Sequence, residues 1–230
     1  MTRFDRHRPL LSEDGWTRLR STPVVLAGVG GLGTNVAMLL ARLGVQELEL
    51  WDPGVVDEPD LNRQILYGET DLGRAKVDTA VERLQMINGA ITMRPLGHEL
   101  DAPAFGELTS CADRSFVVFD CLDSFGARAS LAELQERFAR PVFHGGVDSW
   151  YGQVTTFLPG GGGYTRAFGA DYASQSGPAK PIMPHVVAAV ASFQVGEFVR
   201  WCELPDHTPL SDALLFYDGR SMSTRSVRLG

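Results

Sequence analysis

A glycine-rich turn with the sequence GVGGLG, at residues 28–33, limits the possible folds of this chain more than any other segment. An apolar run at residues 23–27 precedes it, and residues 36–43 follow with the spacing of a helix, which predicts a strand, a tight turn and a helix. Glycines lack β-carbons, so the backbone can approach a ligand closely, and the amides at a helix start attract anions. The glycines expected to line this site are Gly28, Gly30, Gly31 and Gly33. The turn therefore predicts a site for the phosphates of a nucleotide.

An acidic residue and two cations follow the turn. Asp52 ends the next apolar strand, about 20 residues after the turn, where a Rossmann unit places an acid on the ribose hydroxyls. Arg63 and Lys76 then add positive charge in a chain whose net charge is −7. Backbone amides suffice for the pyrophosphate of a dinucleotide, whereas a triphosphate that releases pyrophosphate needs cations. The combination favours ATP over NAD or FAD, although either cation alone is compatible with an ordinary surface charge.

The pattern along the rest of the chain predicts an α/β protein with a Rossmann-like three-layer fold. Strands are expected at residues 48–51, 93–96, 115–120, 141–144, 150–158, 214–218 and 225–229, and helices at 74–88, 102–108, 127–139 and 186–201. Strands alternate with helices in the first half, which predicts a parallel sheet, and the later strands extend it in antiparallel fashion. Asp120 and Asp123 then lie at the carboxyl edge of the sheet, where open α/β folds bind ligands.

We expect one domain over residues 1–230. It comprises an N-terminal arm at residues 1–20, a Rossmann-like nucleotide-binding half at 21–148 and an antiparallel half at 149–230. Turns are expected at Gly145 and Gly146 and at residues 160–163. Residues 164–184 are expected to form a long irregular loop, a kind of segment that often carries function.

The composition of the chain excludes several classes of protein. The net charge of −7 argues against a nucleic-acid partner, because proteins that bind a phosphate backbone present basic surfaces. No stretch approaches the roughly 20 apolar residues of a membrane span, and the first residues are too polar for a secretory signal, so we expect a cytoplasmic protein. The three cysteines, Cys111, Cys121 and Cys202, lie far apart, which predicts neither a disulfide framework nor a cysteine zinc site.

Taken together and in order, the motifs of this chain resemble the ThiF/MoeB/HesA family, the bacterial relatives of ubiquitin-activating enzymes. The motifs are GVGGLG, Asp52, Asn62-Arg63-Gln64, Gly73-Arg74-Ala75-Lys76 and Asp120-Cys121-Leu122-Asp123. The resemblance also includes the arm at residues 3–6, the strand around Gln153 and the apolar helix near the end, so it covers most of the chain.

This resemblance implies ATP-dependent adenylation. In that reaction the C-terminal glycine carboxylate of a ubiquitin-like sulfur-carrier protein, ending in Gly-Gly, attacks the α-phosphorus of ATP and pyrophosphate leaves, as in thiamine or molybdopterin synthesis. A terminal carboxylate has a pKa of roughly 3.3–3.7, so it is ionised at neutral pH and needs no general base. The half formed by residues 149–230 would bind the carrier.

The resemblance also implies roles for individual residues. Asp52 would bind the ribose, Arg63 and Lys76 the phosphates, and Asp123 a magnesium ion. Arg6 would reach the γ-phosphate of the opposite subunit, which implies a homodimer. The nucleotide site would further be lined by Asp60, Asn62 and Gln64.

Three features depart from the family pattern. Asp60 stands where the family usually has Asn, which puts a carboxylate beside the expected triphosphate, where it would bind magnesium indirectly or weaken ATP binding. Many members of the family carry two Cys-x-x-Cys pairs that bind a structural zinc. In this chain the corresponding regions read Gly-Tyr-Thr-Arg at residues 163–166 and Ser-Met-Ser-Thr at 221–224, so no structural zinc is expected. The expected loop at residues 164–184 has no cysteine, so no thioester or persulfide step is expected on it.

Several alternatives remain open. An NAD-dependent oxidoreductase explains the glycines and Asp52 but gives no role to Arg63, Lys76 or Asp123. A non-catalytic family member would only bind a nucleotide or a partner, and another member would adenylate a peptide or a modified tRNA base. For Asp123 the alternative to a magnesium ligand is a helix N-cap.

Overall fold

The structure is a computed structural model that describes residues 1–99, 115–161, 163–169 and 181–230. Its strands are β1 (Val24–Ala27), β2 (Glu47–Trp51), β3 (Thr92–Leu96), β4 (Val117–Asp120), β5 (Val142–Asp148), β6 (Tyr151–Phe157), β7 (Ala213–Asp218) and β8 (Ser223–Arg228). Its α-helices are α1 (Glu13–Ser21), α2 (Gly31–Leu43), α3 (Lys76–Ile87), α4 (Phe125–Phe138), α5 (Gly163–Phe168) and α6 (Pro184–Glu203). Short 3-10 helices cover Arg8–Leu10, Glu58–Asp60 and Glu69–Asp71.

The strands form one eight-stranded sheet in the order β3-β2-β1-β4-β5-β6-β7-β8. Strands β1 to β5 pair in parallel, and β6, β7 and β8 each run antiparallel to the strand before them. The predicted α/β fold, parallel in its first half and antiparallel in its second, is confirmed.

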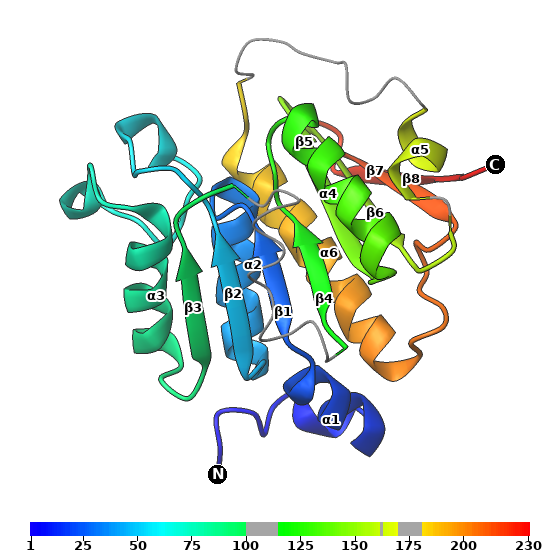
Figure 1. Cartoon of the computed structure of the whole chain (residues 1–230), viewed down its shortest axis with the longest axis horizontal. Helices are drawn as coiled ribbons and strands as arrows, with labels where there is room; N and C mark the ends of the chain where they lie inside the picture. The colour runs from blue at the N-terminus through cyan, green and yellow to red at the C-terminus, as the bar shows by residue number, and fades with distance from the viewer. Residues whose placement is uncertain (100–114, 162, 170–180) are drawn as a thin grey trace.

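Alternate residues of the central strands point to opposite faces of the sheet and form two apolar cores. Val24 and Leu26 of β1 pack on one face with residues of α2, α3 and α6. Val25 and Ala27 pack on the other face with residues of α4 and α5. In Figure 1, α4 lies in front of the sheet and α2 and α6 lie behind it, which is the predicted three-layer arrangement.

Two expectations from the sequence are wrong. Gly145 and Gly146 lie inside β5, paired with β6, and not in a turn. A β-carbon on Gly145 would lie 2.4 Å from the side chain of Gln194, so α6 can approach the strand only because that residue is glycine. The first part of the expected irregular loop forms α5, whose Tyr164 is buried.

Some expectations fall on parts of the chain that the structure does not describe. They are the helix at residues 102–108, Cys111, and residues 170–180 of the expected loop. Over the described ranges, no helix combines the length and apolar character needed to cross a membrane.

The carboxyl ends of β1, β2 and β4 meet at one edge of the sheet. Strand β1 lies between β2 and β4, so the strand order reverses there, and ligands of open α/β sheets bind at such a point. The N-terminus and α1 lie at the opposite end of the strands (Figure 1).

Candidate functional site

Two glycines of the turn after β1, Gly28 and Gly33, have no room for a side chain. Gly28 has a φ of 91°, which L side chains rarely adopt. A β-carbon on Gly33 would lie 2.0 Å from the carbonyl oxygen of Gly28, and one on Gly28 would lie 2.8 Å from that of Cys121. This tight turn brings the N-terminus of α2, the end of the helix that attracts anions, to the carboxyl edge of the sheet.

Asp52 stabilises the turn through hydrogen bonds to the backbone. Its Oδ2 accepts a hydrogen bond from the backbone N–H of Val29 at 2.8 Å, and its Oδ1 accepts one from that of Gly54 at 2.8 Å. The stem of Lys76 packs on the same segment, because a β-carbon on Gly54 would lie 3.4 Å from Lys76 Cδ. The acid predicted to bind the ribose therefore lies beside the glycine turn and also holds its shape.

Arg63 and Gln64 lie against the glycines at the start of α2. Arg63 Cγ lies 3.3 Å from the position of a β-carbon on Gly31, and Gln64 Nε2 lies 3.7 Å from that of one on Gly30. Asn62 is exposed, and its Oδ1 accepts a hydrogen bond from Arg63 Nη1 at 2.9 Å. Gln64 is buried, and its Oε1 has no hydrogen-bond partner among the described residues.

Asp60 lies between the two cations predicted to bind phosphates. Its Oδ2 lies 3.1 Å from Nζ of Lys76, and its Oδ1 lies 3.6 Å from Nη2 of Arg63. Gln64 Nε2 donates a hydrogen bond to the same Oδ1 at 2.5 Å. The structure thus gathers three residues of the predicted nucleotide site around one carboxylate.

Tyr67 belongs to this group of residues, although the sequence analysis missed it. Its hydroxyl lies 2.9 Å from the carbonyl oxygen of Val29 in the turn and 3.1 Å from that of Lys76 at the start of α3. Burial, together with the charges of Asp52 and Asp60, raises the pKa of Tyr67 far above its ordinary value, so the hydroxyl remains a donor. In the sequence, only the position of Tyr67 within the motif region pointed to this role. An aromatic residue of the hydrophobic core would look the same in the sequence.

A buried network holds the loop that follows β4. Oδ2 of Asp120 accepts hydrogen bonds from His144 Nδ1 at 2.6 Å, the Tyr164 hydroxyl at 2.8 Å and Arg128 Nε at 3.1 Å. Burial raises the pKa of Asp120, but Arg128 and His144 outweigh it and hold that pKa below its ordinary value. Asp120 Oδ1 also accepts from the N–H of Leu122 at 3.1 Å, and Arg128 donates to the Leu122 carbonyl, so this loop has a defined shape.

The sequence analysis did not identify the partners of Asp120. Burial lowers the pKa of His144, so its ring is neutral and Nδ1–H donates to the carboxylate. Asp120 and His144 lie directly opposite each other on β4 and β5. Only the register of the sheet brings them together, and no spacing in the sequence indicates it.

Asp123 follows this network and is exposed. Ser124, and not Asp123, caps α4 by accepting a hydrogen bond from the N–H of Ala127, so the N-cap alternative is wrong. Across the part of the chain that is described, no three His, Cys, Asp or Glu side chains gather into a metal site. Magnesium bound with a nucleotide needs only one or two protein carboxylates, because phosphates and water complete its shell, and Asp123 fits that requirement.

Arg6 lies far from the other predicted site residues of its own chain. Its neighbour Phe4 packs against Gly44, and His7 Nε2 lies 3.2 Å from the carbonyl of Leu43, both at the end of α2. The glycine turn is at the start of that helix, whose 13 residues span about 20 Å. The structure therefore does not bring Arg6 to the glycine turn of the same chain.

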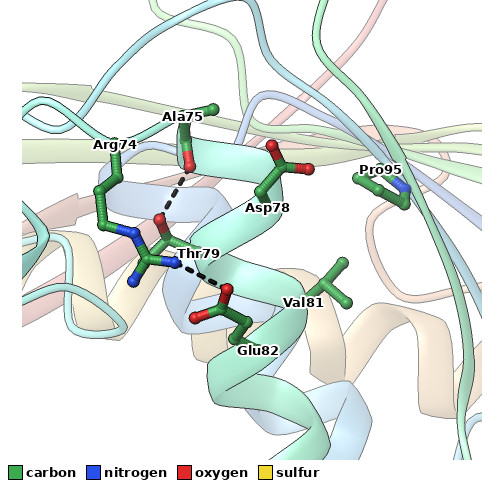
Figure 2. A pocket seen from close by; sticks show the side chains of 7 residues that line it. All are labelled: Arg74, Ala75, Asp78, Thr79, Val81, Glu82 and Pro95. Atoms are coloured by element: carbon green, nitrogen blue, oxygen red, sulfur yellow. Dashed lines mark hydrogen bonds and ion pairs between the residues drawn. The ribbon is translucent and has the colours of Figure 1, made fainter.

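A shallow pocket beside α3 is lined by none of the predicted site residues. Figure 2 shows its lining, which comes from α3, the residues just before it, and Pro95 of β3. Its cation, Arg74, pairs with Glu82 at 2.7 Å and with Asp71 at 3.0 Å. Asp78 adds another negative charge to the lining, so this pocket does not offer a phosphate site.

Comparison with known proteins identifies related sequences over the whole chain. A family model described as the ThiF family matches residues 4–230. The SAMP-activating enzyme E1 of Haloferax volcanii is 28% identical over 237 residues, which cover 99% of this chain and 84% of that protein. The molybdopterin-synthase adenylyltransferase of Salmonella typhimurium is 29% identical over 240 residues, which cover 100% of this chain and 92% of that protein.

A solved structure has the same fold. The crystal structure of E. coli MccB with ATP matches with a TM-score of 0.79 and 18% sequence identity. The match covers 100% of this chain and 72% of that chain. At this identity the likeness concerns the fold alone.

Proposed function

The chain belongs to the ThiF family, and we propose that it is an ATP-dependent adenylyltransferase acting on the C-terminal carboxylate of a ubiquitin-like sulfur-carrier protein. The observation that carries this proposal is the convergence of Arg63, Gln64 and Lys76 beside the glycine turn. Relatives named as an adenylyltransferase and as an activating enzyme support the reaction class.

In the proposed reaction, an oxygen of the carrier's terminal carboxylate attacks the α-phosphorus of ATP. A bond forms between these two atoms, and the bond from the α-phosphorus to the oxygen that bridges to the β-phosphorus breaks. The products are an acyl-adenylate and pyrophosphate. Because the carboxylate is already ionised at neutral pH, the protein needs only to hold the reactants in line and to stabilise the charge that builds on pyrophosphate.

The residues of the site supply these two functions. The N-terminus of α2 would hold phosphate oxygens, and Asp52 would hold the ribose. The side chains of Arg63 and Lys76 are 23% and 14% exposed, so their charges are partly shielded from water and would act strongly on the leaving pyrophosphate. Asp123 would hold a magnesium ion that arrives with the nucleotide.

We place the carrier on the antiparallel half, residues 149–230. Strand β8 is the last strand of the sheet in this half, and all of its residues are exposed. Exposed sheet edges commonly bind extended peptides through backbone hydrogen bonds, which suits the extended tail of a carrier.

Carrier-dependent exchange of pyrophosphate into ATP tests the proposal. The assay uses a panel of small ubiquitin-like carriers ending in Gly-Gly, because exchange requires both adenylation and its reversal. We expect Lys76→Ala and Arg63→Ala each to lower the exchange rate by about 100-fold, since each removes a charge that stabilises the leaving group. Arg42→Ala, an exposed cation in the last turn of α2, is the matched control and should leave the rate unchanged.

Normal exchange in both site variants would show that the phosphate site lies elsewhere. Tight NAD binding without ATP binding would favour the oxidoreductase alternative. If exchange depends on a peptide and on none of the carriers, the partner is a peptide and the proposed carrier is wrong.

A further inference from the structure

We propose that Asp60 is an internal counterion that competes with the outer phosphates of the nucleotide for Arg63 and Lys76. This inference rests on the proposed function, because it takes those two cations as the groups that bind the β- and γ-phosphates. It adds that a single carboxylate controls how tightly the site holds ATP and pyrophosphate.

The carboxylate of Asp60 receives the kind of contacts that a bound phosphate receives. Its Oδ2 lies 3.1 Å from Nζ of Lys76 and accepts a hydrogen bond from the backbone N–H of Asp57 at 3.2 Å. Its Oδ1 accepts from Gln64 Nε2 at 2.5 Å and lies 3.6 Å from Nη2 of Arg63. Cations, a side-chain amide and a backbone N–H thus converge on two oxygens, as they do on bound phosphates.

These contacts lie next to the glycine turn. Gln64 Nε2, which donates to Asp60, lies 3.7 Å from the position of a β-carbon on Gly30. Arg63 Cγ lies 3.3 Å from the corresponding position on Gly31. Phosphates bound to the amides at the start of α2 would therefore lie next to Arg63 and Gln64, two of the residues that contact Asp60.

Asp60 halves the positive charge that the two cations offer. Arg63 and Lys76 contribute +2 and Asp60 contributes −1, which leaves +1. The side chains of Asp60 and Lys76 are only 13% and 14% exposed, so water screens their interaction weakly. Incoming phosphates must either displace this carboxylate or bear its repulsion, and both weaken their binding.

The same competition favours release of pyrophosphate. After the bond between the α- and β-phosphates breaks, Arg63 and Lys76 are paired again with Asp60 as the product leaves. The cations therefore do not remain unpaired in a partly buried site, and the exit of a strongly charged product costs less.

Binding measurements on Asp60→Asn test this role. The variant keeps the shape of the side chain and removes its charge. By isothermal titration calorimetry, we expect it to bind inorganic pyrophosphate and ATP about tenfold more tightly than the unaltered protein. Adenosine should bind equally to both proteins, because it carries no phosphate. Glu58→Gln, at an exposed position of the same 3-10 helix, removes an equal charge and should leave all three affinities unchanged.

Equal or weaker binding of pyrophosphate and ATP by Asp60→Asn would overturn the inference. Asp60→Ser is a second variant with the same expected gain, and thermal unfolding of both variants verifies that they are folded. Pyrophosphate binding requires neither carrier nor catalysis, so tighter binding without any carrier-dependent exchange contradicts the proposed function alone. Exchange by the unaltered protein, with no gain in affinity in the variants, contradicts this inference alone.

Discussion

A single hydroxyl group connects the glycine turn to the segment that carries Lys76, which is predicted to bind phosphate. Tyr67 is 7% exposed, and its hydroxyl contacts the carbonyl oxygens of Val29 and Lys76. A buried acceptor that loses its donor costs about 1–3 kcal/mol. Tyr67 is therefore a positioning residue, because it acts on the nucleotide through the turn and through the start of α3.

Replacing this hydroxyl should affect both stability and binding. We expect Tyr67→Phe to lower the free energy of unfolding by about 1–2 kcal/mol, measured by urea denaturation. Calorimetry should show ATP binding weakened by roughly threefold to tenfold, because the turn and Lys76 lose their common donor. Tyr151→Phe, an exposed tyrosine of β6, is the control. A loss of stability with unchanged ATP affinity would restrict Tyr67 to a structural role.

Among the secondary-structure elements, the junction of β1 and α2 depends on an unusually close approach of backbone segments. The turn folds Gly33 onto the carbonyl of Gly28, and Gly28 onto the end of β4. No side chain fits between them, so the residues at these positions decide whether the helix start reaches the carboxyl edge of the sheet.

Alanine at Gly33 should open this junction. A β-carbon would lie 2.0 Å from the Gly28 carbonyl oxygen, so we expect Gly33→Ala to lower the free energy of unfolding by about 1–3 kcal/mol and to abolish ATP binding. Gly196→Ala is the matched control, because this exposed glycine of α6 has open space around it. It should raise stability by about 0.5–1 kcal/mol. Equal stabilities of the two variants, measured by chemical denaturation, would contradict the close contact.

For the molecule as a whole, the candidate site and the N-terminal arm lie at opposite ends of α2. Phe4 and His7 pack at the end of that helix, so Arg6 between them cannot act in its own site. The proposed role of Arg6 at the γ-phosphate therefore requires a second subunit. The proposed mechanism therefore requires a homodimer for activity.

Complementation between two inactive variants tests this requirement. Arg6→Ala and Lys76→Ala should each exchange pyrophosphate far more slowly than the unaltered protein when they are tested as pure proteins. Co-expressed in equal amounts, they should regain roughly a quarter of normal activity, because half of the dimers are mixed and each mixed dimer has one complete site. Mixed dimers without activity would contradict a role of Arg6 in the opposite subunit.

Local patterns in the chain were sufficient to predict most of its elements and the glycine turn. The two-residue and 3.6-residue periodicities reflect which side chains face a core, and they led to the sheet and the helices. Asp52 directly follows β2, and Asp123 comes three residues after the end of β4, so their position at the carboxyl edge of a parallel sheet also followed from their place in the chain. The failures at Gly145 and α5 occurred where packing against distant residues, such as Gln194, decides the conformation.

Contacts between residues far apart in the chain required the folded structure. The pairing of Asp60 with Lys76 depends on how loops close, and the pairing of Asp120 with His144 depends on how strands align. The distance of Arg6 from the glycine turn depends on the direction in which α2 crosses the molecule. Such contacts leave no periodic signal, because burial and hydrogen bonding in three dimensions, and not the local backbone preference, determine which side chains meet.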